Sequence, residues 1–99
     1  MITGAQCCAA RALVEVTIAK LARRSGVDAR TIESFEQKAD EPDNGTIQLL
    51  QSTLEDLGAV FIPENGGGAG VRLRFSRSET KQIGRLENEG GMPGSNTVP

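Results

Sequence analysis

The 99-residue chain contains no histidine and only two cysteines. Histidine and cysteine provide many metal ligands, nucleophiles and general bases. With so few of them, the sequence offers no metal cluster and no convincing nucleophile–base pair. We therefore expect no enzymatic activity, no metal and no cofactor.

The sequence also lacks a long apolar run, and no cationic leader precedes an apolar segment. These absences predict a cytoplasmic protein with no membrane partner, and two unpaired cysteines agree with that location. Cys7 and Cys8 are adjacent, so on a helix their side chains diverge and are not expected to bond to each other. We expect Cys7 in the core and Cys8 at the surface. Redox sensing through Cys8 and a bridge between subunits stay open as alternatives.

Charge is low overall, with a formal net value of −2 at pH 7, but it is unevenly distributed. Residues 17–38 hold five basic side chains against three acidic ones, a local balance of +2, whereas residues 39–45 hold three acidic side chains and no basic one. This pattern argues against a general nucleic-acid coat and allows a local basic face. An acidic linker beside such a face would repel a wrongly oriented duplex.

Residues 17–36 have the spacing of a helix-turn-helix. Thr17 is a suitable N-cap, and Gly26 follows the first helix where a left-handed backbone is needed. Asp28 caps a second helix that we expect over residues 28–38. The apolar stripe of the two helices has i, i+3, i+4 spacing and comprises Ile18, Leu21, Ala22, Ile32 and Phe35.

Further helices are expected on either side of this unit. Thr3 and Gln6 form a capping-box pattern at the start of the first one, and its expected core residues are Cys7, Ala10, Leu13 and Val14. After a polar loop over residues 38–44, another helix is predicted over 46–57 and ends at Gly58. Its expected core residues are Ile47, Leu50, Leu54 and Leu57, while Leu49 is a candidate contact for a partner subunit.

The hydrophobic period changes after Gly58. Residues 59–62 and 71–75 read as two strands around a glycine-rich turn, which predicts a β-hairpin. An isolated hairpin is marginal in water, so it must pack on the helices or pair with another chain. The glycines are not expected to bind phosphate, because no Lys-Ser/Thr follows them. Arg72 and Arg74 could be solvated, contact phosphates or lie in a dimer interface.

Several segments together resemble the lambda-repressor-like, XRE class of bacterial and phage regulators, in particular a small alphaproteobacterial subset. The resemblance covers roughly residues 2–75 and rests on 3–13, 21–27, 30–36, Pro42 before Thr46, 57–68 and 70–74. It implies a mainly α, compact four-helix DNA-binding domain that acts as a homodimeric transcriptional regulator, such as a repressor. The corresponding division is a helix-turn-helix domain over 1–58, a possible dimerisation hairpin over 59–75, and a short helix with a flexible tail over 76–99.

In this class the second helix of the motif lies in the major groove of double-stranded DNA. The residues expected to read bases there are Ala29, Arg30, Ser34 and Gln37. Arg30 would form bidentate bonds to guanine, and Ala29 would contact a thymine methyl group. The residues expected to hold phosphates, together with backbone amides near Thr46, are Thr17, Thr31, Lys38 and Thr46.

Two departures from the class concern phosphate binding. Ile18 stands where a glutamine usually braces the DNA backbone, and Cys8 replaces a frequent basic residue. Both changes remove a phosphate contact and so weaken the salt-dependent part of DNA affinity. The alternative is a protein-interaction module, an antitoxin or anti-activator with weak or no DNA binding, whose C-terminal segment wraps a protein partner.

Overall fold

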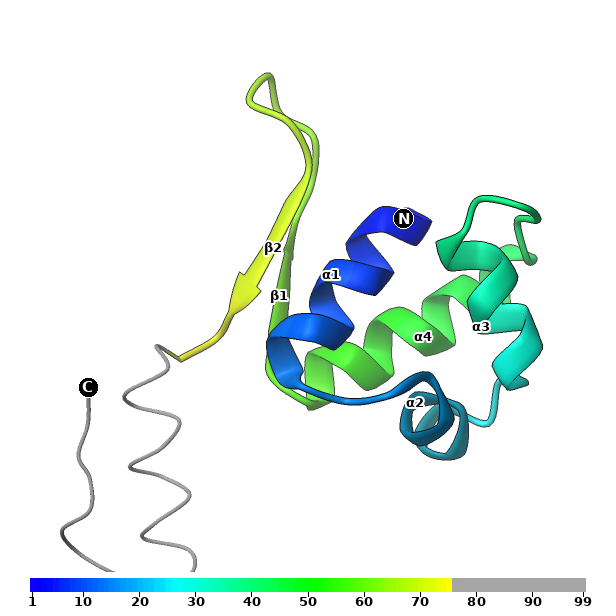
Figure 1. Cartoon of the computed structure of the whole chain (residues 1–99). Helices are drawn as coiled ribbons and strands as arrows, with labels where there is room; N and C mark the ends of the chain where they lie inside the picture. Colours follow the sequence, from blue (N-terminus) through cyan, green and yellow to red (C-terminus); the bar gives the residue numbers. More distant parts are fainter. Residues whose placement is uncertain (76–99) are drawn as a thin grey trace, which may run out of the picture.

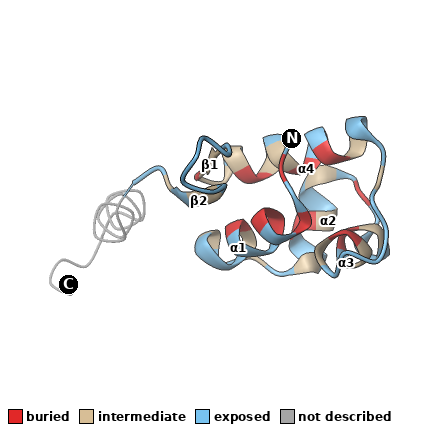
Figure 2. Ribbon diagram, turned by 90° about the horizontal axis from the view of Figure 1, so that it is seen from above, coloured by how far each residue is buried: buried red, intermediate tan, exposed pale blue. Residues whose placement is uncertain are grey.

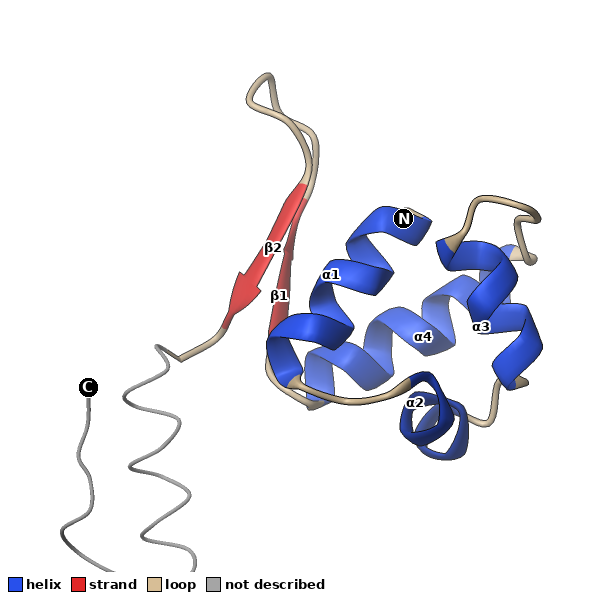
Figure 3. Cartoon of the chain, in the orientation of Figure 1, coloured by secondary structure: helices blue, strands red, loops and turns tan. Residues whose placement is uncertain are grey.

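The computed structural model describes residues 1–75, which form four helices followed by a two-stranded antiparallel sheet (Figures 1 and 3). The mainly helical fold with a C-terminal hairpin, expected from periodicity, is confirmed. The elements are α1 (Gly4–Val14), α2 (Ile18–Ser25), α3 (Ala29–Glu36), α4 (Asn44–Asp56), β1 (Ala59–Ile62) and β2 (Gly70–Leu73).

Helix α1 begins with the predicted capping box. The Thr3 hydroxyl accepts from the Gln6 amide at 3.1 Å, and the Gln6 side chain accepts from the Thr3 amide at 3.0 Å. The helix ends at Glu15, which has a left-handed backbone. One expectation for this helix is wrong, because Leu13 is 36% exposed and lies outside the buried core. Only the N-terminal part of α1 has its apolar face fully covered.

Helix α4 starts earlier than its periodicity predicts. Asn44 is its first residue, so the last part of the expected loop belongs to the helix, and Thr46 lies inside the first turn. The cause is Asp43, whose carboxylate accepts from the Thr46 amide at 2.8 Å and caps the helix. Apolar spacing does not predict this cap, because the residues just before Thr46 are mostly polar.

The core is formed where the four helices converge (Figure 2). Its largest fully buried side chains come from every helix and are Leu21, Ile32, Ile47, Leu50, Leu54 and Cys7. Cys7 is buried and Cys8 is exposed, as expected. Ile18 and Ala22, from the predicted stripe of α2, are only half-buried and pack at the margin of this core.

The hairpin packs on the helices. In its register Ala59 is opposite Leu73 and Phe61 is opposite Val71. Ala59 is buried, and Phe61 and Val71 pack against the core. The Gln6 side chain donates to the Gly70 carbonyl at 2.9 Å and to the Ile62 carbonyl at 3.4 Å, so it joins α1 to both strands.

Two expectations concern the extent of ordered structure. Strand β2 ends at Leu73, two residues before the predicted end, and Phe75 is 42% exposed. The short helix and the tail expected over 76–99 lie outside the described residues. Within residues 1–75, no helix has both the length and the apolar character needed to span a bilayer.

Gly4 provides a test of the packing between α1 and α3. A Cβ atom at this position would collide with the carbonyl oxygen of Phe35 near the end of α3. We expect Gly4→Ala to lower the free energy of unfolding by about 1–3 kcal/mol, because backbone rather than a flexible side chain must move. Urea denaturation followed by circular dichroism measures this change.

Gly45→Ala is the matched control for that substitution. Gly45 is also in the first turn of a helix, but its added Cβ would meet only the Asp43 carboxylate, at an ordinary 3.7 Å. Alanine has the higher helix propensity, so this variant should be at least as stable as the parent chain. Equal stability of the two variants would contradict the close α1–α3 contact.

Candidate nucleic-acid interface

Helices α2 and α3 and the turn between them form the helix-turn-helix unit in which most of the candidate DNA-binding residues were expected. Thr17 accepts from the Lys20 amide at 3.0 Å and caps α2, and Asp28 accepts from the Arg30 amide at 3.0 Å and caps α3. Gly26 ends α2 with φ of 80°, a conformation that glycine adopts without steric cost. Val27 is buried and anchors the turn. Each local signal thus has the structural role predicted for it.

The orientation of α3 is set by an ion pair with α1. The Arg11 guanidinium donates from Nε and Nη2 to the two carboxylate oxygens of Glu36, each at 2.7 Å. The exposed fractions of the Arg11 and Glu36 side chains are only 18% and 6%. Arg11 also donates to the Val16 carbonyl at 3.2 Å. This pair ties the last residue of α3 to the last turn of α1.

The expected base-reading residues are divided by exposure. Ala29, Arg30 and Gln37 are exposed, whereas Ser34 is half-buried. Arg30 lies with Ser34 in a surface groove of about 490 Å³ between α3 and the start of α4. The residues that line it are Asp28, Arg30, Thr31, Ser34, Asp40, Glu41, Pro42, Asp43 and Thr46. Ala29 and Gln37 lie outside this groove.

The expected phosphate-binding residues do not form one cluster. Thr31 and Thr46 line the groove, but Thr17 and Lys38 do not. Lys38 was expected in the recognition helix, yet α3 ends at Glu36 and Lys38 has a left-handed φ of 61°. The Thr46 amide was expected to face phosphate, but Asp43 already accepts its hydrogen bond. That amide is therefore already engaged by a carboxylate of the chain itself.

The groove is acidic, which inspection of the α3 sequence alone does not reveal. Four carboxylates line it, and Arg30 is its one basic side chain. Hydrogen bonding from Thr46 holds the pKa of Asp43 below its usual value, so this carboxylate is charged at neutral pH. The charge count over residues 39–45 signalled the acids, but only the fold brings them beside α3.

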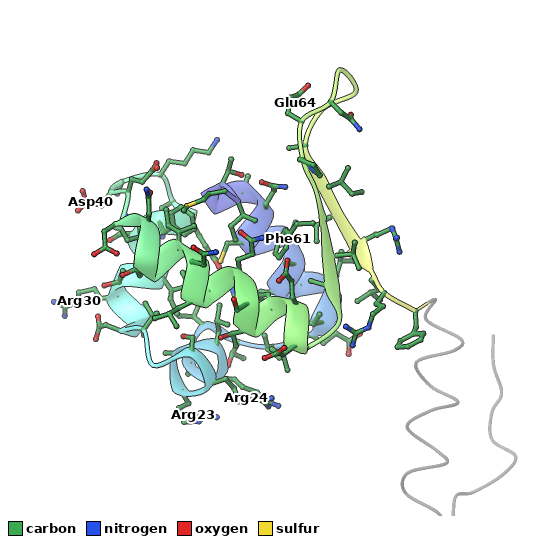
Figure 4. All side chains as sticks on the ribbon, turned by 180° about the vertical axis from the view of Figure 1, so that it is seen from behind. Arg23, Arg24, Arg30, Asp40, Phe61 and Glu64 are labelled. Atoms are coloured by element: carbon green, nitrogen blue, oxygen red, sulfur yellow. The ribbon has the colours of Figure 1, made fainter. Side chains whose placement is uncertain are left out.

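A basic edge lies on the other side of Arg30. Figure 4 shows Arg23 and Arg24 projecting from α2, with Arg30 on α3 and Asp40 beyond the far end of α3. Lys20, Arg23 and Arg24 are exposed. These three residues of α2 are absent from the set of site residues that the sequence predicts, although the charge count over residues 17–38 includes them. Arg30 therefore stands between a positive and a negative surface.

The two departures from the resembled class differ in the structure. Ile18 is half-buried and packs against the core, so its side chain has a structural role. Cys8 is exposed on α1. Neither isoleucine nor cysteine is a basic side chain that could hold a phosphate.

The hairpin arginines lie away from α3. In Figure 1 the sheet and α3 lie on opposite sides of α1. The Arg74 guanidinium donates to the Glu55 carbonyl at 3.4 Å and lies 5.5 Å from the centre of the Phe75 ring. The Arg72 guanidinium donates to the Leu73 carbonyl at 3.1 Å. These residues do not extend the surface that carries Arg30.

The two thiols provide a test of the buried α1–α3 contact. Burial, together with the charge of Glu36, raises the pKa of the Cys7 thiol far above its usual value, and its Sγ donates to Glu36 Oε2 at 3.3 Å. Because the thiolate is the reactive form, we expect only Cys8 to react rapidly with an aromatic disulfide reagent at pH 8. Absorbance at saturating reagent should count one thiol in the native chain and two in denaturant.

Cys8→Ser is the control for the thiol count. This variant should show no fast-reacting thiol until it unfolds. Two fast thiols in the native parent chain would contradict the burial of Cys7 between α1 and α3.

A search of family models matches none to this chain, and no curated protein matches its sequence.

Proposed function

We propose that this chain is a sequence-specific regulator of transcription that binds double-stranded DNA, a repressor-type member of the lambda-repressor-like, XRE class acting in the cytoplasm. In this proposal it binds as a homodimer to an inverted repeat. The observation that carries the proposal is the capped α2–turn–α3 unit, which leaves Arg30 exposed in the first turn of α3 beside the basic edge of α2. A helix placed in this way fits the major groove with its N-terminal turns toward the bases.

In the proposed complex, α3 reads bases mainly through its first turn. Arg30 donates two hydrogen bonds to O6 and N7 of a guanine, and Ala29 contacts a thymine methyl group. Ser34 lies one turn further along α3, and Gln37 directly follows the last residue of the helix; both meet neighbouring base edges. Ser34 is half-buried in the surface groove of the protein. It can therefore contact only a base edge that reaches into that groove.

Phosphate binding in this proposal depends on the basic edge of α2. Lys20, Arg23 and Arg24 are exposed there and flank the helix that enters the groove of the DNA. Thr17, Thr31 and Lys38 add contacts to phosphates around them. Thr46 contributes only where a phosphate replaces Asp43, because both its amide and its side chain hydrogen-bond to that carboxylate. Each cation that neutralises a phosphate releases counterions, so affinity falls with increasing salt.

The acidic groove makes the two sides of this interface differ in charge. Asp40 and Glu41 lie beside Arg30, on the side opposite to the basic edge. A phosphate backbone that approaches from this side meets like charge, which costs free energy in the wrong orientation. The acids thereby favour one docking orientation and reduce affinity for DNA of any sequence.

A second function is favoured by the same acids. Four carboxylates around one arginine also suit a basic protein segment, and Ile18 provides no phosphate contact. The alternative is an antitoxin or anti-activator that binds protein rather than DNA. Titration of labelled duplex followed by fluorescence polarisation separates the two, because DNA binding predicts affinity that decreases steeply with salt.

Arg30→Ala tests the base-reading role. We expect binding to the operator to weaken by about 1–3 kcal/mol, and the preference for operator over random duplex to decrease, because the guanine contact is lost. Sites selected from a random DNA pool with the parent chain provide the operator. Gel shift or fluorescence polarisation then measures both affinities.

Arg74→Ala is the charge-matched control. It removes the same charge from the far side of the molecule and should leave the sequence preference unchanged. If Arg30→Ala bound the operator as tightly as the parent chain does, the assignment of Arg30 would be wrong.

Neutralising the acidic groove should have the opposite effect. We expect Asp40→Asn with Glu41→Gln to tighten binding to operator and random duplex together, on the order of several-fold at low salt, because like-charge repulsion is removed. The ratio of the two affinities should stay the same or decrease. A loss of affinity in the double variant would show that these carboxylates do not oppose DNA.

A further inference from the structure

A hollow of about 500 Å³ lies between the hairpin and the helices. Its walls come from the first residues of the chain, from α1 and α4, and from β1 and the hairpin turn. Figure 4 shows Phe61 and Glu64 on the side of the hairpin that faces the helices. None of the candidate DNA-binding residues lines this space, which we call the hairpin hollow. Its volume is within the range of small-molecule sites in proteins.

The side chain of Gln6 fixes the two sides of the hairpin hollow relative to each other. Gln6 is buried, and its oxygen accepts from the Thr3 amide. Its Nε2 donates to the carbonyls of Ile62 and Gly70. These bonds join α1 to both strands, so the walls are formed without a ligand. A preformed site lowers the entropic cost of binding.

The lining of the hairpin hollow is largely apolar and has a single charge. Within the described part of the chain, Glu64 is the only charged side chain among the lining residues. The apolar side chains around it include those of Ile2, Phe61, Pro63 and Ala69. Because electrostatic complementarity selects a binding partner, this lining favours a ligand that combines a positive charge with an apolar body.

The carboxylate of Glu64 is held in position by the hairpin turn. Its Oε2 accepts from the Gly66 and Gly68 amides, both at 3.2 Å. Among residues 1–75, its Oε1 has no hydrogen-bond partner and Glu64 takes part in no ion pair. Gln51 also retains an acceptor, because it donates from Nε2 to Glu55 Oε2 at 3.2 Å and uses only its nitrogen. Two acceptors can therefore receive the N–H groups of a ligand.

We propose that the hairpin hollow binds a small organic cation, namely an ammonium or guanidinium group carried on an aromatic or branched apolar body. The charged group donates to Glu64 and Gln51. The body packs against Ile2, Phe61 and Pro63 and removes their apolar surface from water. The hollow is separate from the surface that carries Arg30, so this inference does not rest on the proposed function.

The size of the hairpin hollow favours a free molecule over a lysine side chain of another protein. A lysine has a thin, unbranched stem, which would leave much of a hollow of about 500 Å³ unfilled. An aromatic or branched body covers more of the apolar lining and gains more from its burial.

Three probes that share a phenyl ring test the proposal: phenethylammonium, the neutral phenethyl alcohol and the anion phenylpropionate. Nuclear magnetic resonance titration of the isotope-labelled full chain should show saturable shifts with phenethylammonium at Gln51, Gly66, Gly68 and Ala69. Its dissociation constant should be on the order of millimolar, because so small a ligand gains limited free energy. The alcohol should bind about threefold to fivefold more weakly, as expected for loss of one solvent-accessible ion pair. Phenylpropionate should bind more weakly still.

Three variants connect these affinities to the hairpin hollow. Glu64→Gln keeps an acceptor for the turn amides but removes the charge, so phenethylammonium should bind no more tightly than the alcohol. Ala69→Leu places a larger side chain in the lining and should weaken both probes. Asp56→Asn removes one carboxylate from an exposed position of α4 outside the hollow and should leave both affinities unchanged. Circular dichroism melting checks that each variant is folded.

Several outcomes would overturn the proposal. They are the absence of saturable shifts in the parent chain, shifts confined to residues away from the hollow, and an alcohol or anion that binds as tightly as phenethylammonium. An unchanged preference for the amine in Glu64→Gln would also do so. Butylammonium carries the charged group of a lysine side chain without a ring. If it bound as tightly as phenethylammonium, the site would select a lysine of another protein rather than a free ligand with an apolar body.

Discussion

The contact between α1 and the end of α3 is the constraint on which the candidate interface depends. Arg11 and Glu36 form a bidentate ion pair that is largely removed from water. Burying two charges is costly, and removing one partner from such a pair typically costs about 3–5 kcal/mol, because the other charge is left uncompensated. The pair therefore specifies how α3 is positioned on the domain.

Close backbone packing acts together with this pair. Gly4 brings the start of α1 against the Phe35 carbonyl near the end of α3, and Cys7 fills the space beside Glu36. Helix α3 is short, and a helix of this length is marginal without tertiary support. The Asp28 cap stabilises its N-terminal end, and the contact with α1 stabilises its C-terminal end. The exposed first turn with Arg30 is thus presented on a supported helix.

The charges on this surface affect both the affinity and the orientation of the proposed binding to DNA. A basic edge on α2 and an acidic groove beside the start of α4 flank the same arginine. Such an arrangement limits affinity for DNA in general while it retains a preferred direction of approach. It also explains how a chain with a net charge of −2 can be proposed to bind a polyanion. The hairpin is remote from this surface.

Local signals in the sequence predict most of the elements. Thr3, Thr17, Asp28 and Gly26 have their expected roles, since a cap or a left-handed turn depends on a few adjacent residues. Asp43 was missed because its cap lies in a polar run without apolar spacing. Leu13 was placed in the core because periodicity indicates which face of a helix is apolar, but not how far its neighbours cover that face. In the candidate site, Arg30 was found by its position in the motif.

The sequence by itself determined where the helices, turns and hairpin form, because those choices depend on residues only a few positions apart. The tertiary structure decided which distant residues meet. Arg11 pairs with Glu36 across 25 positions, and the Gln6 amide reaches Gly70 across 64. The same packing brings the carboxylates of residues 40–43 beside Arg30. None of these contacts has a local signal, since each exists only after the helices have packed around one core.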